Sequence, residues 1–246
     1  MKKSVARSRS SLSRLLGRVM PAVIAAFCAM TAGAQEDTAN PLKLQYNKPA
    51  RQWTEALPIG NGRISAMVFG DVGSERLQLN EDTLWAGSPY DPVNPTAKEA
   101  IPEVRKLIFD GKYREAASLI DSKVLAKPQS QMPYQTVGNL TLNFGDAAGA
   151  ENYKRVLDLD TATATITYTK GGVEYKREMF ASTPDDVIVV RLSASKPGML
   201  SFTAGMNTPM KATVKTEESN TLVMDGQGGD ASGIKGEIKY QARVQV

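Results

Sequence analysis

The sequence predicts a mainly β protein: an antiparallel β-sandwich of two large sheets (a super-sandwich), with a short αα-hairpin inserted between its strands. From residue 42 onwards, apolar and polar residues alternate in one run after another, and turns rich in Gly, Asp and Pro separate the runs at intervals of about 8–12 residues. Only the stretch 102–120 follows a helical period instead. Alternation with a period of two also implies that each sheet has one solvated face and one buried face.

Strands are expected wherever this alternation holds over several residues. The runs are 42–46, 63–70, 75–79, 140–144, 153–157, 163–168, 173–180, 186–192, 199–203, 221–224 and 238–246. Asp71-Val72-Gly73 is a plausible hairpin turn between the second and third runs. A loop with three prolines, 88–95, then forbids ladder pairing and holds the chain extended.

Two short helices are expected after this loop. Pro102 suits a first helical turn, and the apolar residues that follow share one face until Asp110-Gly111 ends the helix. A second apolar stripe lies within 113–120. We expect these helices to form an αα-hairpin that lies against the sheet and carries no chemistry.

The first 34 residues have the composition of a secretory signal peptide. They hold six Lys and Arg and no acidic residue, followed by an apolar run, 19–30, that is too short for the roughly 20 residues that span a bilayer. Ala32-Gly33-Ala34 is a small-x-small cleavage pattern, with cutting expected between Ala34 and Gln35. An uncleaved N-terminal anchor is the alternative; a lipoprotein site at Cys28 is disfavoured by the bulky Phe27 before it. The expected location is periplasmic or secreted, with no membrane span after signal removal and a domain covering 35–246.

Composition excludes several classes of function. Six of the 30 Lys and Arg lie in 1–34, so 24 remain against 26 Asp and Glu, a net charge of −2 without the signal. The basic character is therefore a targeting feature, and no nucleic-acid partner is expected. Cys28 is the only cysteine, so the fold must rest on its core rather than on disulfides. With no histidine, Ser-His-Asp and Cys-His catalysis are excluded and the commonest zinc ligand is missing.

The stretch 53–87 is the most informative part of the sequence. It contains both tryptophans, Trp53 and Trp85, close to carboxylates and asparagines around glycine turns. An indole ring stacks well on the apolar face of a sugar, which suggests carbohydrate contact. The alternative is that each ring packs into a core or an interface, as most large aromatic side chains do; this is favoured for Trp85, which follows a strand, and evenly balanced for Trp53.

Glu55, Glu81 and Asp82 are the carboxylates to weigh, because glycosidases typically use two. Glu81 and Asp82 are adjacent, so on a strand they face opposite ways and do not both address one bond. The run from Asn80 to Thr83 reads better as a turn in which side chains satisfy backbone donors. The functional alternative is that one carboxylate reaches a sugar hydroxyl from the edge of the domain.

Two glycine-rich segments carry weaker signals. Gly60-Asn61-Gly62 resembles the start of a phosphate-binding fingerprint, but Ser65 occupies the third glycine position and no βαβ unit follows. We expect a tight turn there, with positive φ available to all three residues. The segment 225–230 has too few ligands in register for a calcium loop. No metal or cofactor is predicted.

Four long segments, 53–62, 77–85, 131–140 and 153–160, closely resemble the N-terminal domain of glycoside hydrolase family 95, the α-L-fucosidases. The resemblance runs from about Pro41 to the last residue. It implies inverting hydrolysis of α-L-fucosyl, sometimes α-L-galactosyl, linkages, with a fucosylated glycan as the partner. In that family the catalytic residues lie in an (α/α)6 barrel that follows this domain, so none maps onto this sequence. Residues that the resemblance would place at the rim of the active site or at the barrel interface are Trp53, Glu55, Asn61, Asn80, Glu81, Asp82 and Trp85.

Three hypotheses for the chain follow. The first is that the chain is the N-terminal domain of a fucosidase, which supports the missing barrel and is inactive alone. The second is a self-standing carbohydrate-binding module, and the third is a purely structural domain. The alternation continues to Val246 without a turn, so a chain cut within a strand and before the barrel is expected. A large apolar patch at 53–87 would indicate a missing partner domain, whereas a small polar groove with a stacked ring would favour direct sugar binding.

Overall fold

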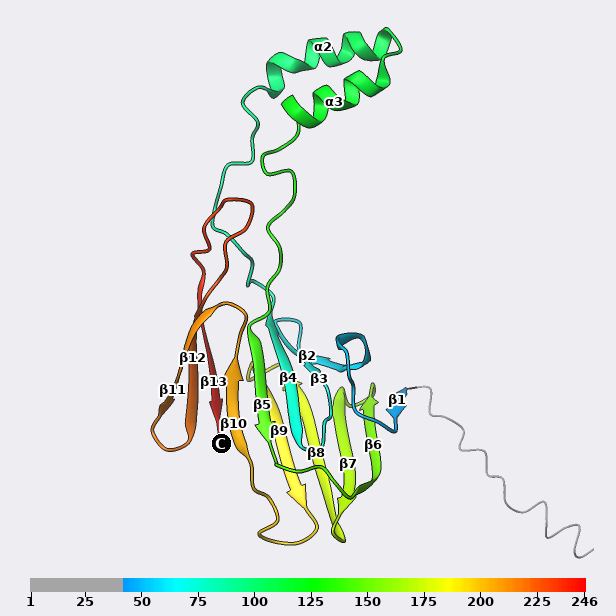
Figure 1. The fold of residues 1–246 in the computed structure, drawn as a ribbon, viewed down its shortest axis with the longest axis vertical. Helices are drawn as coiled ribbons and strands as arrows, with labels where there is room; N and C mark the ends of the chain where they lie inside the picture. The colour runs from blue at the N-terminus through cyan, green and yellow to red at the C-terminus, as the bar shows by residue number, and fades with distance from the viewer. Residues whose placement is uncertain (1–41) are drawn as a thin grey trace, which may run out of the picture. The chain divides into compact units, whose positions relative to one another are not determined.

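The computed structural model describes residues 42–246, which form three antiparallel sheets and a helical hairpin (Figure 1). The predicted signal peptide and its cleavage site lie outside the described residues. The mainly β fold and the hairpin predicted from the sequence are confirmed, and the two predicted sheets are joined by a smaller third one.

The first sheet has five strands in the order β1-β6-β7-β8-β9. Their bounds are β1 Lys43–Tyr46, β6 Ala150–Asp158, β7 Thr163–Lys170, β8 Val173–Ser182 and β9 Val187–Ala194. From β6 to β9 the strands are sequential neighbours, as expected of hairpins with short turns.

The second sheet has the order β10-β5-β4-β3-β2, and the third has the order β11-β12-β13. The bounds in the second sheet are β10 Thr203–Asn207, β5 Gly138–Asn143, β4 Ser74–Glu81, β3 Ile64–Val68 and β2 Leu57–Gly60. Those in the third are β11 Lys211–Glu217, β12 Thr221–Gln227 and β13 Lys239–Gln245. A short 3-10 helix, η1 (Trp53–Glu55), precedes β2.

The first and third sheets cover different parts of the second sheet. Strands β6, β7 and β8 pack over β2, and β9 packs over β3, whereas β11 and β12 pack over β10. One apolar core joins all three sheets, and its most buried members include Val68, Leu77, Ile166, Met179 and Met224. These residues occupy the alternate positions that the period-two pattern assigns to the inner faces.

A buried ion pair also links the first two sheets. Arg177 of β8 places Nη1 3.1 Å from Oε2 of Glu75 on β4, and both side chains are almost fully buried. The same guanidinium donates to the backbone oxygens of Asp71 and Val72, both at 2.6 Å. Removing one partner would leave a buried charge uncompensated, so both members of the pair are needed where these two sheets meet.

The helices of the hairpin are α2 (Ala97–Phe109) and α3 (Tyr113–Lys123). They pack on each other, and among residues 42–246 neither helix makes more than marginal contact with a strand. The expectation that the hairpin lies against the sheet is therefore wrong. Pro102 lies within α2 rather than in its first turn, because Ala97 to Ile101 already form the first turn.

Most predicted strands lie where the alternation placed them, with three differences. The run 199–203 is mainly loop, with Met199 and Leu200 exposed, and β10 starts only at Thr203. Strand β2 was not predicted, because its four residues include Pro58 at an edge of the sheet. Strand β11 was not predicted because its side chains are nearly all exposed and follow no alternation.

Candidate functional site

The candidate site is built on the turn between β2 and β3. The Asn61 side chain closes this turn, because its Oδ1 accepts hydrogen bonds from the backbone N–H groups of Arg63 (3.0 Å) and Ile64 (2.9 Å). Of the three residues of this turn, only Gly62 adopts a positive φ, at 97°. The asparagine shapes the turn through its side chain and leaves its own backbone in an ordinary conformation.

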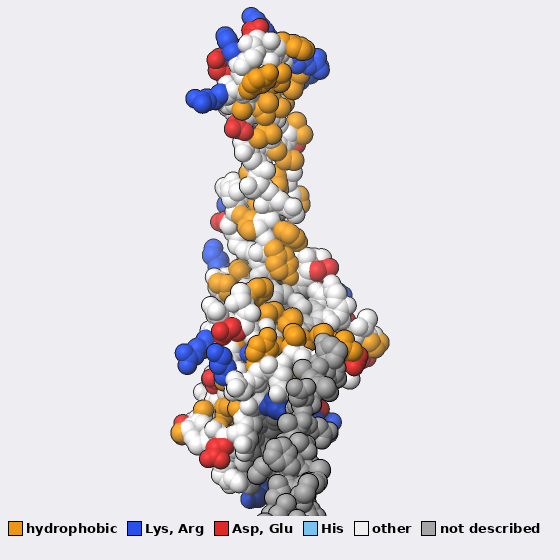
Figure 2. All heavy atoms as spheres, turned by 90° about the vertical axis from the view of Figure 1, so that its right-hand side faces the viewer, with side chains coloured by type: hydrophobic (Ala, Val, Ile, Leu, Met, Phe, Trp, Pro, Cys, Tyr) orange, Lys and Arg blue, Asp and Glu red, His pale blue; other side chains and the backbone are white. Residues whose placement is uncertain are grey.

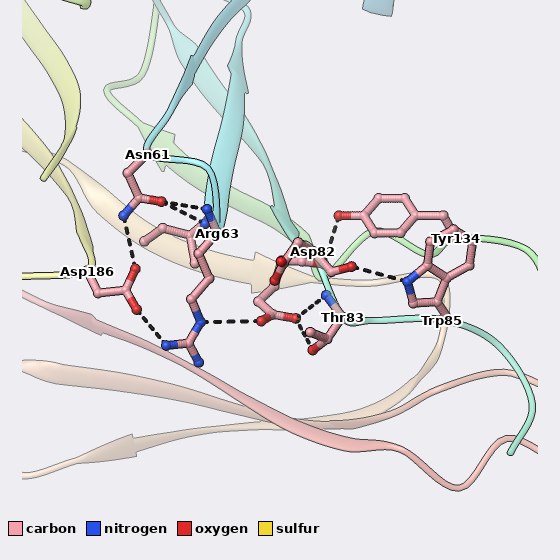
Figure 3. Close-up of polar contacts among 9 residues, drawn as sticks. Asn61, Arg63, Asp82, Thr83, Trp85, Tyr134 and Asp186 are labelled. Atoms are coloured by element: carbon pink, nitrogen blue, oxygen red, sulfur yellow. Dashed lines mark hydrogen bonds and ion pairs between the residues drawn. The ribbon is translucent and has the colours of Figure 1, made fainter. Parts of the chain in front are cut away.

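The same asparagine reaches across to the first sheet. Its Nδ2 donates to Oδ1 of Asp186, in the connection between β8 and β9, at 2.9 Å (Figure 3). It also donates to the backbone oxygen of Ser182, the last residue of β8, at 2.9 Å. Arg63 adds an ion pair from Nη1 to Oδ2 of Asp186 at 2.7 Å. Asn61 therefore both closes one turn and ties it to another 121 residues further along the chain.

Glu81 ends β4 on the other side of Arg63. Its Oε2 accepts hydrogen bonds from the backbone N–H and the hydroxyl of Thr83, at 2.9 and 2.7 Å, while Oε1 lies 3.5 Å from Arg63 Nε. This is the turn-capping role expected for Asn80 to Thr83. The neighbouring Asn80 pairs with Ser65 in the β3–β4 ladder.

Trp85 lies just beyond this turn and packs on Tyr134. The two rings meet edge to face, with centroids 5.3 Å apart and planes at 70°. The indole N–H donates to the backbone oxygen of Asp82, and the Tyr134 hydroxyl donates to that of Glu81 (Figure 3). Trp85 thus holds the segment 131–135 against the end of β4, which is the packing role favoured for it.

Trp53 and Glu55 lie apart from the other five candidates. They sit on η1, at the opposite end of β2 from Asn61. A strand of four residues spans roughly 13 Å, and hydrogen bonds tie Glu55 to its own surroundings: its Oε2 accepts from the backbone N–H of Arg51, and its backbone oxygen accepts from the buried Arg155. Trp53 is 55% exposed. The seven predicted residues therefore form two groups rather than one site.

Glu81 and Glu55, one from each group, are poorly suited to donate a proton at neutral pH. Burial works against ionisation of Glu81, but hydrogen bonds from Thr83 and Arg63 outweigh it and hold its pKa below the ordinary value. The Arg51 backbone hydrogen bond lowers the pKa of Glu55. A glycosidase general acid needs the opposite, a raised pKa.

Glu75 has the required direction of shift but not the access. Burial raises its pKa, which the guanidinium of Arg177 opposes, and the side chain is fully enclosed between the sheets. Glu55, Glu75 and Glu81 therefore each lack the combination of access and raised pKa that a glycosidase general acid needs.

Three residues of the arrangement were missed from the sequence: Arg63, Tyr134 and Asp186. Tyr134 lies inside one of the segments that carry the family resemblance, so a signal existed. Asp186 precedes β9 with φ of +56°, a conformation that Asp tolerates better than most residues. No pattern in the sequence indicates that it meets Asn61.

An open groove begins beside this cluster. Asn80, Glu81 and Asp186 line one part of it, and apolar residues of β4, β5 and β9 line much of the rest, around a volume of about 840 Å³. Strand β13 adds both apolar and polar residues, and the end of β11 and the turn after it add Glu217 and Glu218. Nothing in this lining resembles a small polar pocket with a stacked aromatic ring.

Two further properties concern residues 42–246 alone. No group of three or more Cys, Asp or Glu side chains in this range gathers closely enough to hold a metal ion. None of the helices described is long and apolar enough to cross a membrane.

Three relatives in the comparison with known proteins carry fucosidase names. The chain is 43% identical over 195 residues to "Alpha-L-fucosidase 2" of Arabidopsis thaliana, covering 78% of this chain and 23% of the relative. It is 32% identical over 202 residues to "Probable alpha-fucosidase A" of Aspergillus niger, covering 78% and 24%, and 30% identical to that of Aspergillus oryzae, covering 64% and 22%. The chain thus spans about a quarter of the length of the relatives it matches.

Residues 44–246 match the family described as "Glycosyl hydrolase family 65, N-terminal domain". This match covers nearly all the described residues and accounts for all three sheets and the hairpin. The chain therefore belongs to this family of glycosyl hydrolase N-terminal domains.

Proposed function

We propose that this chain is the N-terminal β domain of a secreted α-L-fucosidase of the family 95 type, and that it supports a catalytic (α/α)6 barrel without being active alone. The observation that carries the proposal is the engagement of the carboxylates at 53–87 in turns and ion pairs, combined with the greater length of relatives named as fucosidases. The chemistry proposed for the complete protein is inverting hydrolysis of α-L-fucosyl linkages in glycans.

The hairpin supports a role in holding a second domain. Phe109 and Tyr113 flank its turn and are 88% and 69% exposed, and Val93 on the segment that leads to it is 72% exposed. Figure 2 shows hydrophobic side chains gathered on this part of the surface. Exposed apolar side chains concentrated on one element are typical of a surface that another domain covers. We assign this contact to the barrel.

A domain exchange tests the proposal. Residues 42–246 replace the matched region of the Arabidopsis relative, and fucose release from a 2′-fucosylated oligosaccharide is measured for the chimera and for the isolated chain. We expect turnover by the chimera and none by the isolated chain. Phe109→Ser in the chimera should lower activity, while Lys106→Ser, on the same helix, serves as the matched control. Turnover by the pure isolated chain would overturn the proposal.

Secretion is a separate part of the proposal and has its own test. When the 246-residue chain is expressed in a bacterial host, the exported form should begin at Gln35, as determined by N-terminal sequencing. An intact N-terminus in a membrane fraction would favour the uncleaved anchor instead.

A stand-alone carbohydrate-binding module is the second candidate, because Trp53 exposes more than half of its surface. Titration of the chain with fucosylated oligosaccharides, followed by tryptophan fluorescence, distinguishes the two. Saturable binding that Trp53→Ala abolishes would favour the binding module, whereas no binding is expected of a supporting domain.

A further inference from the structure

The layer formed by the first and third sheets has a gap. Strand β9 is the edge strand of the first sheet and packs over β3. Strand β13 is the edge strand of the third sheet, and the other two strands of that sheet, β11 and β12, pack over β10. Strands β4 and β5 lie between β3 and β10 in the sheet below. Among the described residues, no strand pairs with the outer edge of either β9 or β13.

The groove described above occupies this gap. Its floor includes Leu79 of β4 with Leu140 and Leu142 of β5. One wall is formed by the inward residues of β9, Ile188, Val190 and Leu192, and the other by Ala242 and Val244 of β13. The groove therefore has an apolar floor and an unpaired strand edge along each side, and its lining also includes the charged residues Glu81, Asp186, Glu217, Glu218 and Arg243.

We propose that this groove is the seat of one further β-strand, contributed by the part of the longer protein that follows this domain. The occupant is an extended segment in which every second residue is apolar. Its backbone pairs with the free N–H and C=O groups of β9 and β13, and its apolar side chains fill the groove above β4 and β5. Strands of eight and seven residues border the groove, so we expect an occupant of similar length.

Three observations favour this occupant. A small ligand would satisfy neither row of edge groups, and long unpaired edges are what natural sheets avoid. The family match is to an N-terminal domain, and the chain spans about a quarter of its relatives, so a continuation would supply the strand. This inference rests on one part of the proposed function, namely that the chain belongs to a longer protein. It depends on neither the substrate nor the activity of that protein. The competing occupant is an edge strand of a second copy of this chain.

An extension experiment tests the inference. About 30 residues, enough for a turn and two strands, are taken from the sequence that follows the matched region in the Arabidopsis relative and appended to Val246. We expect Tm to rise by roughly 4 °C or more over the unextended chain, and the fluorescence of the hydrophobic dye ANS to fall about twofold, because the groove is no longer open to the dye.

Paired variants locate the effect. Val190→Asp places a charge on the groove wall, whereas Val189→Asp places the same charge on the opposite face of β9, since adjacent strand residues point to opposite faces. The rise in Tm caused by the extension should disappear with Val190→Asp and persist with Val189→Asp.

Hydrogen exchange of the extended chain without substitutions provides a measurement that does not depend on either variant folding. Amides along β9 and β13 should gain about tenfold protection or more, because edge groups become paired. Unchanged protection there would overturn the proposal. The proposal would also be overturned if the unextended chain formed a dimer in analytical ultracentrifugation and the same amides were already protected in that dimer. Because no activity is measured, these results are distinguishable from a failure of the proposed enzyme function.

Discussion

Arg63 and Asp186 form an ion pair at 2.7 Å that joins the β2–β3 turn of one sheet to the β8–β9 connection of the other. The Arg63 side chain is 66% exposed, and an ion pair that is this open to solvent contributes little to stability. The junction therefore depends more on Asn61, which is half-buried and bonded to both sides. Asn61, a candidate for sugar contact, serves here to connect the two layers.

Asn61→Asp tests this junction. The substitution keeps the Oδ1 acceptor that closes the turn but replaces the Nδ2 donor with an oxygen facing Asp186 and the Ser182 carbonyl. We expect a loss of about 1–3 kcal/mol in the free energy of unfolding, measured by urea titration. Asn80→Asp adds the same charge without removing a bond to the other sheet and should cost less.

The double variant Asn61→Asp/Asp186→Asn completes a thermodynamic cycle. The second substitution restores an amide donor opposite the new carboxylate, and Asn tolerates the positive φ of position 186. We expect a favourable coupling of about 1 kcal/mol. Strict additivity of the two single effects would show that the contact contributes nothing.

Glu81 should make part of the fold's stability sensitive to acid. Its pKa is lower in the folded chain than the ordinary value of 4.5, so the unfolded chain binds more protons in that range and stability falls as the pH drops. The contribution is present above about pH 4.5 and is lost as the pH falls through the lower folded pKa. Glu81→Gln should therefore flatten the decline of Tm between pH 5 and 3 by about 2 °C. Glu99→Gln, which removes an exposed carboxylate of α2, is the control variant.

The strands that the sequence predicts well are those whose alternate residues enter the core. Arg155 and Arg177 show the limit of this pattern, because both occupy inward positions although they are charged. Each is accommodated by groups distant in the sequence, the Glu55 carbonyl for Arg155 and the Glu75 carboxylate for Arg177. Periodicity assigns a face to a residue but does not identify the partner that makes burial possible.

The candidate site was predicted in part for the same reason. Asn61 and Glu81 to Trp85 are close because β3 and β4 form a hairpin, which the sequence indicated. Trp53 and Glu55 are distant because β2 lies between them and Asn61. This strand has only four residues, one of them a proline, so the alternation pattern does not reveal it. Asp186 enters from another sheet, which no local pattern shows.

Gly70 should be far less tolerant of substitution than Gly62. Both have positive φ, +79° and +97°, so alanine is strained by a similar amount at each. An added Cβ at Gly70 would lie 2.5 Å from the Tyr153 hydroxyl and 2.6 Å from Cδ of Arg155, whereas at Gly62 it would meet nothing within 4 Å. We expect Gly62→Ala to cost about 1 kcal/mol and Gly70→Ala about 3 kcal/mol or more in urea titration. Similar losses at the two positions would show that backbone strain alone matters.

The helical hairpin should be removable without harm to the sandwich. The helices pack on each other, and the two segments that lead to them are already joined at their ends, where the Lys127 N–H donates to the Pro92 carbonyl at 3.0 Å. Replacing residues 93–126 with a two-glycine turn therefore closes a connection whose ends are adjacent. We expect the far-UV circular dichroism to lose its helical component while Tm stays within about 2 °C of the parent chain.

The base of the hairpin provides the contrast. Trp85 and Tyr134 pair below the junction, and their hydrogen bonds reach the end of β4. Tyr134→Ala should destabilise the chain by about 1–3 kcal/mol, because it removes a ring contact and a hydrogen bond from the sandwich. If excising the hairpin lowered Tm as strongly as Tyr134→Ala does, the hairpin would be part of the sandwich's cooperative unit. The expected separation instead leaves its exposed Phe109 and Tyr113 free for contact with another domain.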